Sequence, residues 1–229
     1  MRKIRLVFLV GPTAVGKTGV AIYLAKRLGS EIISCDSMQL YKGMDIITSK
    51  PKKSELKKVP HHLIGVISPA KEYNVTKYRS VALKKAEEIV KREKVPLFVG
   101  GTGLYMSVLL DGIFKAKAQD QKLRERLYKK AQRYGSAYLH KKLREVDPAA
   151  ARKIHPNDLK RIIRALEVFK VTGKPISQLQ KQRKGLPYNY EVKIFCLNMD
   201  RDKLYKRIDE RVEKMFKEGL VKEAKSFWV

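Results

Sequence analysis

The feature that most constrains this chain is residues 11–18, GPTAVGKT, which fit the pattern G-x-x-x-x-G-K-[ST] of a phosphate-binding loop. An apolar run at residues 4–10 precedes this segment, and a helical pattern at residues 18–28 follows it. A strand, a glycine loop and a helix in this order bring backbone N–H groups to a helix N-terminus, where anions bind. A plain glycine turn is the alternative, but the pattern is rarely met in this context by chance. We therefore predict a site that binds phosphate groups.

The predicted phosphate loop consists of Gly11, Pro12, Thr13, Ala14, Val15, Gly16, Lys17 and Thr18. Lys17 supplies a mobile positive charge for the phosphate oxygens. The hydroxyl of Thr18 is a candidate ligand of Mg²⁺, which is the cofactor that we expect. The loop indicates a bound phosphate group but does not by itself identify ATP as the ligand.

Apolar runs predict strands at residues 4–10, 31–35, 95–100 and 191–199. The first three are almost continuously apolar, which is typical of parallel strands that are covered on both faces. Helical patterns at residues 18–28 and 75–91 lie between them. Strands and helices therefore alternate, and the predicted fold class is α/β. We expect a parallel sheet with flanking helices, like that of P-loop nucleoside triphosphate hydrolases, and an all-helical insertion domain.

Residues 115–184 interrupt the alternation, because they contain helical patterns only. This segment holds 21 Lys and Arg but 6 Asp and Glu, so it carries +15 of the chain's net charge of +28. We predict that residues 1–114 begin the α/β core, that residues 115–185 form a basic helical insertion domain, and that residues 186–229 return to the core.

The excess of basic residues indicates the kind of partner. Heat-adapted proteins also carry many charges, but in them Lys is matched by Glu. Here the basic residues outnumber the acidic ones by 51 to 23, and such an excess repels itself unless a polyanion neutralises it. An ordinary metabolic enzyme is therefore not the default interpretation, and nucleic acid is the expected partner.

Several further features bear on class and location. Cys35 and Cys196 lack a metal-ligand spacing, and the neighbours His61 and His62 point to opposite faces of an extended segment, so we expect no joint metal site. No apolar run approaches the roughly 20 residues of a membrane span. We expect a reduced, cytoplasmic protein without a membrane segment. The apolar end at residues 227–229 leads us to expect a truncated chain.

Three positions beside the phosphate loop are candidates for chemistry. Asp36 directly follows the second predicted strand, where it is a candidate metal ligand or general base, or only the cap of the next turn. Thr102 lies in a second glycine-rich turn, which either binds a ligand or is simply a tight connection. Arg207 and Arg211 share a helix face, and they either neutralise phosphate or form surface salt bridges with nearby acidic residues.

Five segments together resemble the tRNA dimethylallyltransferases. They are GPTAVGKT from Gly11, DSMQLYKGMDIITSKP from Asp36, GGTGLY from Gly100, HPND-x-x-R-x-x-RALEV from His155, and DR-x-x-L-x-x-RI-x-x-RV-x-x-M from Asp200. The resemblance extends from Leu6 to about Glu223 in the order of the family. It implies an enzyme that transfers dimethylallyl from dimethylallyl diphosphate to N6 of the adenosine just 3′ of the tRNA anticodon. Diphosphate is released, and Mg²⁺ is required.

The resemblance also implies roles for single residues. Asp36 is the general base, while Thr102 and Arg211, with Thr13, line the diphosphate and reaction channel. The implied tRNA contacts are Asp36, Ser37, Met38, Gln39, Thr102, Arg124, Lys160, Arg161, Ile162, Ile163 and Arg164. Ile162 and Ile163 fit the apolar stripe of their helix, so the charged members of that run are the stronger candidates. We expect a monomer that binds the anticodon stem-loop.

Three other functions fit parts of the sequence. An adenylate dimethylallyltransferase would modify free AMP, ADP or ATP, but it has no need of a basic insertion. A P-loop kinase for a nucleotide or another small molecule would bind ATP and would need no prenyl donor. An RNA-binding core without catalysis is the third alternative, because complete family members continue past Trp228. An assay with a labelled prenyl donor distinguishes these functions, because the label would move to tRNA, to a free nucleotide or to neither.

Overall fold

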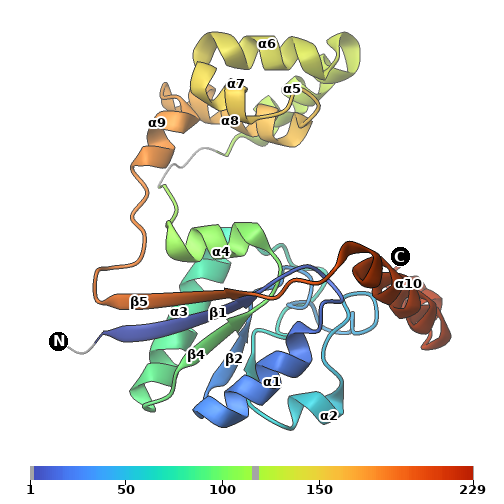
Figure 1. Ribbon diagram of the computed structural model, residues 1–229. Coiled ribbons are helices and arrows are strands. Elements are labelled where there is room, and N and C mark those ends of the chain that lie inside the picture. Colours follow the sequence, from blue (N-terminus) through green and yellow to red (C-terminus); the bar gives the residue numbers. More distant parts are fainter. Residues whose placement is uncertain (1–2, 115–118, 229) are drawn as a thin grey trace. The chain divides into compact units, whose positions relative to one another are not determined.

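The computed structural model describes residues 3–114 and 119–228. The chain divides into two compact units (Figure 1). The α/β unit comprises Met1–Leu110 and Leu186–Val229, and the helical unit comprises Asp111–Gly185.

The helical unit begins four residues before the predicted boundary at residue 115, which itself lies outside the described residues. Phe114 packs against the core of the helices and therefore belongs to them. The backbone at Gly112 lies so close to that of Lys184 that a Cβ atom there would be 1.9 Å from the Lys184 carbonyl oxygen. The segment that enters the helical unit and the segment that leaves it are therefore in close contact at Gly112 and Lys184.

The α/β unit contains a parallel sheet with the strand order β3-β2-β4-β1-β5. The strands are β1 (Ile4–Val10), β2 (Glu31–Ser34), β3 (His61–His62), β4 (Pro96–Val99) and β5 (Tyr190–Cys196). The predicted α/β class is confirmed. β5 ends three residues before the predicted position 199, because its partner β1 ends at Val10, opposite Cys196. The short β3 was not predicted, since two residues produce no recognisable pattern.

Helices cover both faces of this sheet (Figure 1). On one face, α1 (Lys17–Leu28) packs Ala21, Ile22 and Ala25 against strand residues such as Leu9 and Leu97. On the other face lie α3 (Val75–Lys91) and α4 (Gly103–Leu110), whose buried residues join those of the strands in a second cluster. Burial on both faces explains why the central strands are continuously apolar. The remaining helices of this unit are α2 (Lys53–Leu56), α10 (Arg201–Lys217) and α11 (Leu220–Lys225).

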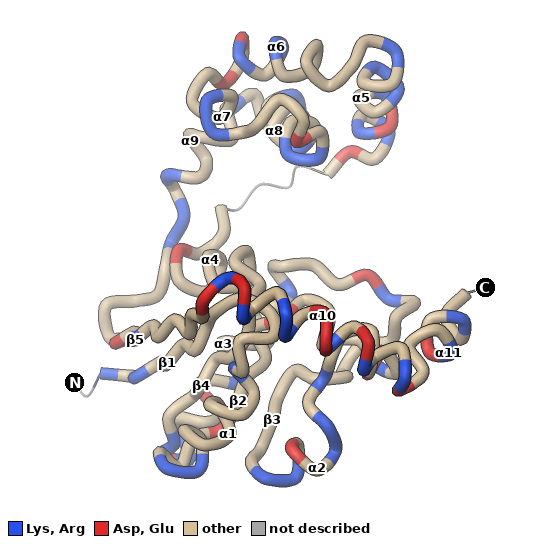
Figure 2. The backbone as a smooth tube through the Cα atoms, turned by 45° about the vertical axis from the view of Figure 1, so that its right-hand side comes forward, with Lys and Arg blue, Asp and Glu red and all other residues tan. Residues whose placement is uncertain are grey.

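The described residues of the helical unit form helices and no strand. The helices are α5 (Gln121–Tyr134), α6 (Ser136–Val146), α7 (Pro148–Lys153), α8 (Leu159–Thr172) and α9 (Ile176–Lys181). The side chains of Asp120, Asp147 and Asp158 accept backbone N–H groups at the starts of α5, α7 and α8, which is the capping role that aspartate performs well. Basic residues occur along these helices (Figure 2).

Two observations concern membrane segments and the chain end. Within residues 3–114 and 119–228, no helix combines the length and the apolar composition that a membrane span requires. At the chain end, the ring of Phe227 lies against Gly43 and the side chain of Trp228 is 86% exposed, while Val229 lies outside the described residues.

The buried carboxylate of Glu31 connects several elements of the α/β unit. Glu31, at the start of β2, lies 2.7 Å from His62 of β3, 2.7 Å from Arg92 and 3.2 Å from Lys94. Burial alone would raise the pKa of Glu31, but the hydrogen bonds from Arg92, His62 and Lys94 lower it to about 2. The ionised form of Glu31 therefore stabilises the fold by joining β2, β3 and the end of α3.

We predict that Glu31→Gln lowers the free energy of unfolding at pH 7 by roughly 1–3 kcal/mol, because strong hydrogen bonds to a charged acceptor are lost. The pKa of Glu31 in the folded state, about 2, lies below the ordinary value of 4.5. Its contribution is therefore complete above pH 4.5 and is lost as the pH falls toward 2. Urea unfolding between pH 3 and pH 7 measures both effects. Glu88→Gln is the matched control, since its side chain is 37% exposed and its ion pair among the described residues is with Lys85. Equal acid dependence in wild type and Glu31→Gln would contradict the prediction.

Candidate active site

The loops that follow β1, β2 and β4 meet at one edge of the sheet, where ligands of open α/β sheets bind. A pocket of about 710 Å³ opens there. Its walls come from the phosphate loop, the turn after β2, residues 47–55, the turn after β4 and one face of α10. Segments that are far apart in the sequence therefore build a single site in the α/β unit.

The phosphate loop wraps around the N-terminus of α1. Lys17 Nζ donates hydrogen bonds to the carbonyl oxygens of Gly11 at 2.9 Å and Pro12 at 2.7 Å. Ala14, with φ of 61°, adopts the left-handed conformation that non-glycine residues rarely take. The predicted loop residues Thr13, Ala14, Gly16, Lys17 and Thr18 line the pocket, while Val15 is buried. The loop therefore presents a cation, a hydroxyl and a helix N-terminus to an anionic ligand.

The charges of the pocket influence one another. Burial lowers the pKa of Lys17, the nearby Arg211 lowers it further, and Asp36 opposes both effects. Burial likewise lowers the pKa of Arg211, and Asp36 again opposes the shift. Lys17, Arg211 and Asp36 thus lie within electrostatic range of each other, so a bound anion would stabilise the two cations.

Glycine is required where the turn after β4 meets the end of β2. A Cβ atom at Gly100 would lie 2.1 Å from the carbonyl oxygen of Cys35. This close approach lets Thr102 Oγ1 accept the backbone N–H of Ser37 at 3.1 Å. The second glycine-rich turn is therefore a tight connection, and at the same time it holds the turn that carries Asp36.

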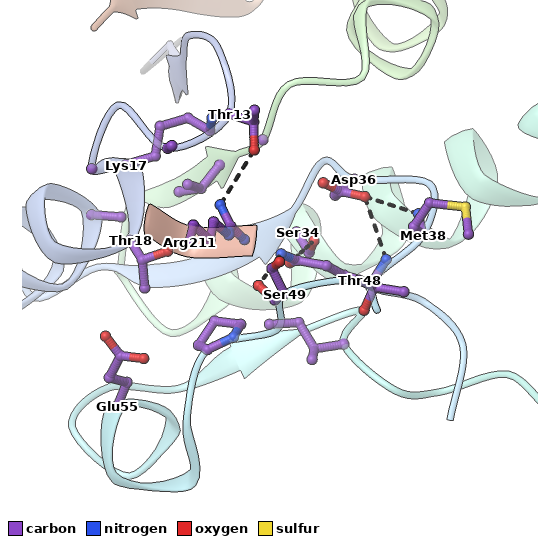
Figure 3. Close-up of a pocket in the computed structure, with 18 of the residues that line it drawn as sticks. Thr13, Lys17, Thr18, Ser34, Asp36, Met38, Thr48, Ser49, Glu55 and Arg211 are labelled. Atoms are coloured by element: carbon purple, nitrogen blue, oxygen red, sulfur yellow. Dashed lines mark hydrogen bonds between the residues drawn. The ribbon is translucent and has the colours of Figure 1, made fainter. Parts of the chain in front are cut away.

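Asp36 caps the turn that follows β2. Its Oδ1 accepts the backbone N–H groups of Met38 at 2.9 Å and Gln39 at 3.4 Å. The side-chain amide of Gln39 also donates to the carbonyl oxygen of Ser49 at 3.3 Å, which connects this turn to the next wall of the pocket. Capping does not remove Asp36 from the site, because its side chain lines the pocket with Lys17 and Arg211 (Figure 3).

Helix α10 contributes two arginines to the pocket. Arg211 Nη1 donates to Thr13 Oγ1 at 3.2 Å (Figure 3). One turn earlier, the guanidinium of Arg207 lies 3.8 Å from the position that a Cβ atom of Gly16 would occupy. In the part of the chain that the structure describes, neither arginine forms an ion pair with an acidic residue. This geometry favours binding of phosphate over surface salt bridges.

Glu223 is a site-forming residue that the sequence analysis missed. From α11, its carboxylate accepts the backbone N–H groups of Asp45 at 3.0 Å, Ile46 at 2.9 Å and Ile47 at 2.8 Å. A second contact nearby joins Lys52, just before α2, to Glu218, at the end of α10, at 3.1 Å. These contacts hold the loop that lines the pocket with Ile47, Thr48 and Ser49. They span 166 to 178 residues, so no local pattern could have predicted them.

The predicted tRNA contacts fall in both units. Asp36, Ser37, Met38, Gln39 and Thr102 lie in the α/β unit, whereas Arg124, Lys160, Arg161, Ile162, Ile163 and Arg164 lie in the helical unit. Lys160 and Arg161 are exposed. Ile162 and Ile163 are 0% and 2% exposed in the helical core, so their side chains pack inside the unit, and the charged members of that run remain the stronger candidates for RNA contacts.

The pocket offers a partial set of ligands for Mg²⁺. Among the described residues, no three His, Cys, Asp or Glu side chains come together as a metal site. His61 and His62 have separate partners, the carbonyl oxygen of Val59 and the carboxylate of Glu31. Mg²⁺ that is shared with substrate phosphates needs only one or two protein oxygens. The hydroxyl of Thr18 and the carboxylate of Asp36 line the same pocket and fit that requirement.

Comparison with known proteins agrees with the sequence resemblance. The profile of the IPP transferase family matches residues 39–229. The tRNA dimethylallyltransferase of Desulforudis audaxviator (strain MP104C) is 50% identical over 222 residues, which are 96% of this chain and 71% of that relative. The tRNA dimethylallyltransferase of Bacillus subtilis (strain 168) is 49% identical over 225 residues, which are 97% of this chain and 71% of that relative.

Two solved structures are also similar. The full-length tRNA isopentenylpyrophosphate transferase from Bacillus halodurans has 43% identity and a TM-score of 0.67, with 99% of this chain and 70% of that chain covered. A eukaryotic dimethylallyltransferase, captured in crystallographic snapshots acting on tRNA, has 30% identity and a TM-score of 0.80, with 98% of this chain and 56% of that chain covered.

We predict that Gly100→Ala lowers the free energy of unfolding by about 1–3 kcal/mol, because the new methyl group would meet backbone atoms that cannot easily move. It should also weaken the binding of inorganic pyrophosphate, since the turn after β2 must shift. Urea unfolding and titration calorimetry measure the two effects. Gly103→Ala is the matched control, because nothing lies within 4 Å of its Cβ position. Equal behaviour of the two variants would show that the contact between Gly100 and Cys35 does not constrain the site.

Proposed function

This chain belongs to the IPP transferase family, and from that premise we propose that it transfers a dimethylallyl group to tRNA. The observation that carries the proposal is a single pocket that unites a phosphate loop, two arginines of α10 and the Asp36 carboxylate. Such a pocket suits a diphosphate ester that reacts beside a base. Relatives that are about half identical over nearly the whole chain are named for this reaction.

Dimethylallyl diphosphate is the proposed donor, with its diphosphate on the phosphate loop. The allylic C–O bond breaks, and its electron pair moves to the diphosphate oxygen. Lys17, Arg211 and the N–H groups at the start of α1 would stabilise the negative charge that develops there. The side chains of Lys17 and Arg211 are already held beside the loop by hydrogen bonds, which favours a site that reorganises little during the reaction.

N6 of the adenosine just 3′ of the anticodon is the proposed acceptor. Its lone pair is delocalised into the ring, so the amine must lose a proton as the new N–C bond forms. Asp36 would accept that proton through the carboxylate that lines the pocket. The adenosine has to leave its stack in order to reach the base, as in other enzymes that modify nucleobases.

Mg²⁺ belongs to this proposal as a cofactor that the hydroxyl of Thr18 and the donor's phosphates would hold. When bound, it would supply positive charge against the leaving diphosphate. The protein groups that share this role are Lys17 and the two arginines of α10.

The basic helical unit is the proposed binding surface for the anticodon stem-loop. Its net charge favours an RNA acceptor over free AMP, which would need no such surface. We also propose that the protein acts as a monomer. We propose a cytoplasmic location, where the protein would meet its tRNA substrate.

The first test is an assay with radiolabelled dimethylallyl diphosphate, Mg²⁺ and either unmodified tRNA or free AMP. We predict that label moves to tRNA alone, and that tRNA binding weakens steeply between 50 and 200 mM salt, by on the order of 10³-fold if six phosphates are contacted. Label on AMP would indicate an adenylate dimethylallyltransferase instead. Consumption of ATP without need of the prenyl donor would indicate a kinase. Retention of tRNA without transfer would indicate an RNA-binding core.

We predict that Asp36→Asn and Asp36→Ala each lower the rate of transfer by about 10²–10⁴-fold while tRNA remains bound, because the general base is lost. The asparagine variant retains an oxygen that can accept the N–H groups of Met38 and Gln39, so it separates catalysis from capping of the turn. Single-turnover rates and filter binding measure the two properties. Unchanged turnover in Asp36→Asn would exclude Asp36 as the base.

A further inference from the structure

In the described part of the helical unit, the carboxylate of Glu167 on α8 is fully buried, with an exposed fraction of 0%. Its Oε1 accepts Arg124 Nε of α5 at 2.8 Å and the backbone N–H of Asp120 at 2.9 Å. Its Oε2 accepts Arg164 Nη1 at 2.7 Å. A single carboxylate therefore connects the start of α5 to two guanidinium groups from different helices.

Glu167 is ionised in this environment. Burial would raise its pKa, but hydrogen bonds from Arg124, from the Asp120 backbone and from Arg164 together lower it. Burying a charge costs free energy, and well-packed apolar residues usually stabilise a core as well as a buried ion pair does. Stability alone is therefore a weak reason for this cluster, which indicates that its arrangement serves another purpose.

The two arginines are placed to act outside the core. The side chains of Arg124 and Arg164 are each 35% exposed, although both reach a carboxylate that is fully buried. Glu167 neutralises one of the two positive charges, so the cluster keeps a net positive charge at the surface. Without Glu167, two guanidinium groups would repel each other. A guanidinium has five N–H donors, so Arg124 can bond Glu167 through Nε and still donate to a phosphate.

We propose that Glu167 is a positioning residue for tRNA, which holds Arg124 and Arg164 side by side so that both contact backbone phosphates. This inference rests on the proposed function, because both arginines are contacts that the family resemblance implies. It goes beyond that function by assigning RNA affinity to a negatively charged residue that cannot itself touch RNA.

The test compares tRNA affinity in Glu167→Gln with that in Glu145→Gln. Each substitution removes one negative charge from the helical unit, but Glu145 is exposed, and its ion pair within the described residues is with Lys142. Net charge alone would make both variants bind tRNA as tightly as wild type or more tightly. If Glu167 positions the arginines, Glu167→Gln should instead weaken binding by about tenfold. The slope of log affinity against log salt should also fall by roughly one for each phosphate contact that is lost.

A double-mutant cycle with Arg124→Gln keeps the inference falsifiable. If Glu167 acts through Arg124, the double variant should bind about as weakly as the weaker single variant, whereas independent effects would multiply. Arg124→Lys, which keeps the charge but loses the planar contact, should also weaken binding and leaves Glu167 intact. Binding of inorganic pyrophosphate to the α/β unit, with thermal melting, checks that each variant is folded.

The outcomes separate this inference from the proposed function. Wild-type affinity in Glu167→Gln, or losses that multiply fully in the double variant, would overturn the positioning role and leave tRNA prenylation intact. A wild-type chain that neither binds tRNA nor prenylates it would overturn both.

Discussion

The pocket depends on how closely the backbone of the turn after β4 approaches the end of β2. At Gly100 that approach leaves no room for a side chain beside the Cys35 carbonyl oxygen. The contact aligns Thr102 with Ser37 and so determines where the turn of Asp36 lies. At Gly11, the phosphate loop approaches the chain after β5 in the same way, since a Cβ atom there would lie 2.4 Å from the Leu197 carbonyl oxygen. Parallel strands bring these turns to one edge, and glycine lets them meet there.

Acidic residues are scarce in this chain, and three of them occupy structural junctions. Glu31 pairs with three basic side chains at the start of β2, and Glu167 pairs with two arginines, one from α5 and one from α8. Glu223 gathers backbone N–H groups of the loop beside the pocket. In a chain of net charge +28, such carboxylates offset repulsion locally and orient the donors around them. The remaining positive charge is then available to a polyanionic ligand.

The two units divide the proposed work according to the chemistry of their ligands. The α/β unit offers a helix N-terminus and cations to a diphosphate, and it places a carboxylate in the same pocket. The helical unit is rich in basic residues, and the buried Glu167 carboxylate pairs with two of them, Arg124 and Arg164. Such an arrangement suits phosphates that are spaced along an RNA backbone. In the proposed function, the diphosphate therefore binds to the α/β unit, and the helical unit supplies contacts to the RNA backbone.

The sequence by itself determined the α/β class, the phosphate loop and the basic helical segment. These features depend on residues that are close in the chain, such as the glycine pattern of residues 11–18 or the basic residues of 115–184. The sequence also singled out Asp36, Thr102 and Arg211 by position and resemblance. Only the tertiary structure decided that Asp36 and Arg211 line one pocket with Lys17, and that Glu223 and Glu167 organise what surrounds the ligands. The contacts of Glu167 with Arg124 and of Glu223 with residues 45–47 join residues 43 to 178 positions apart, and packing of whole elements creates them, so no local periodicity records them.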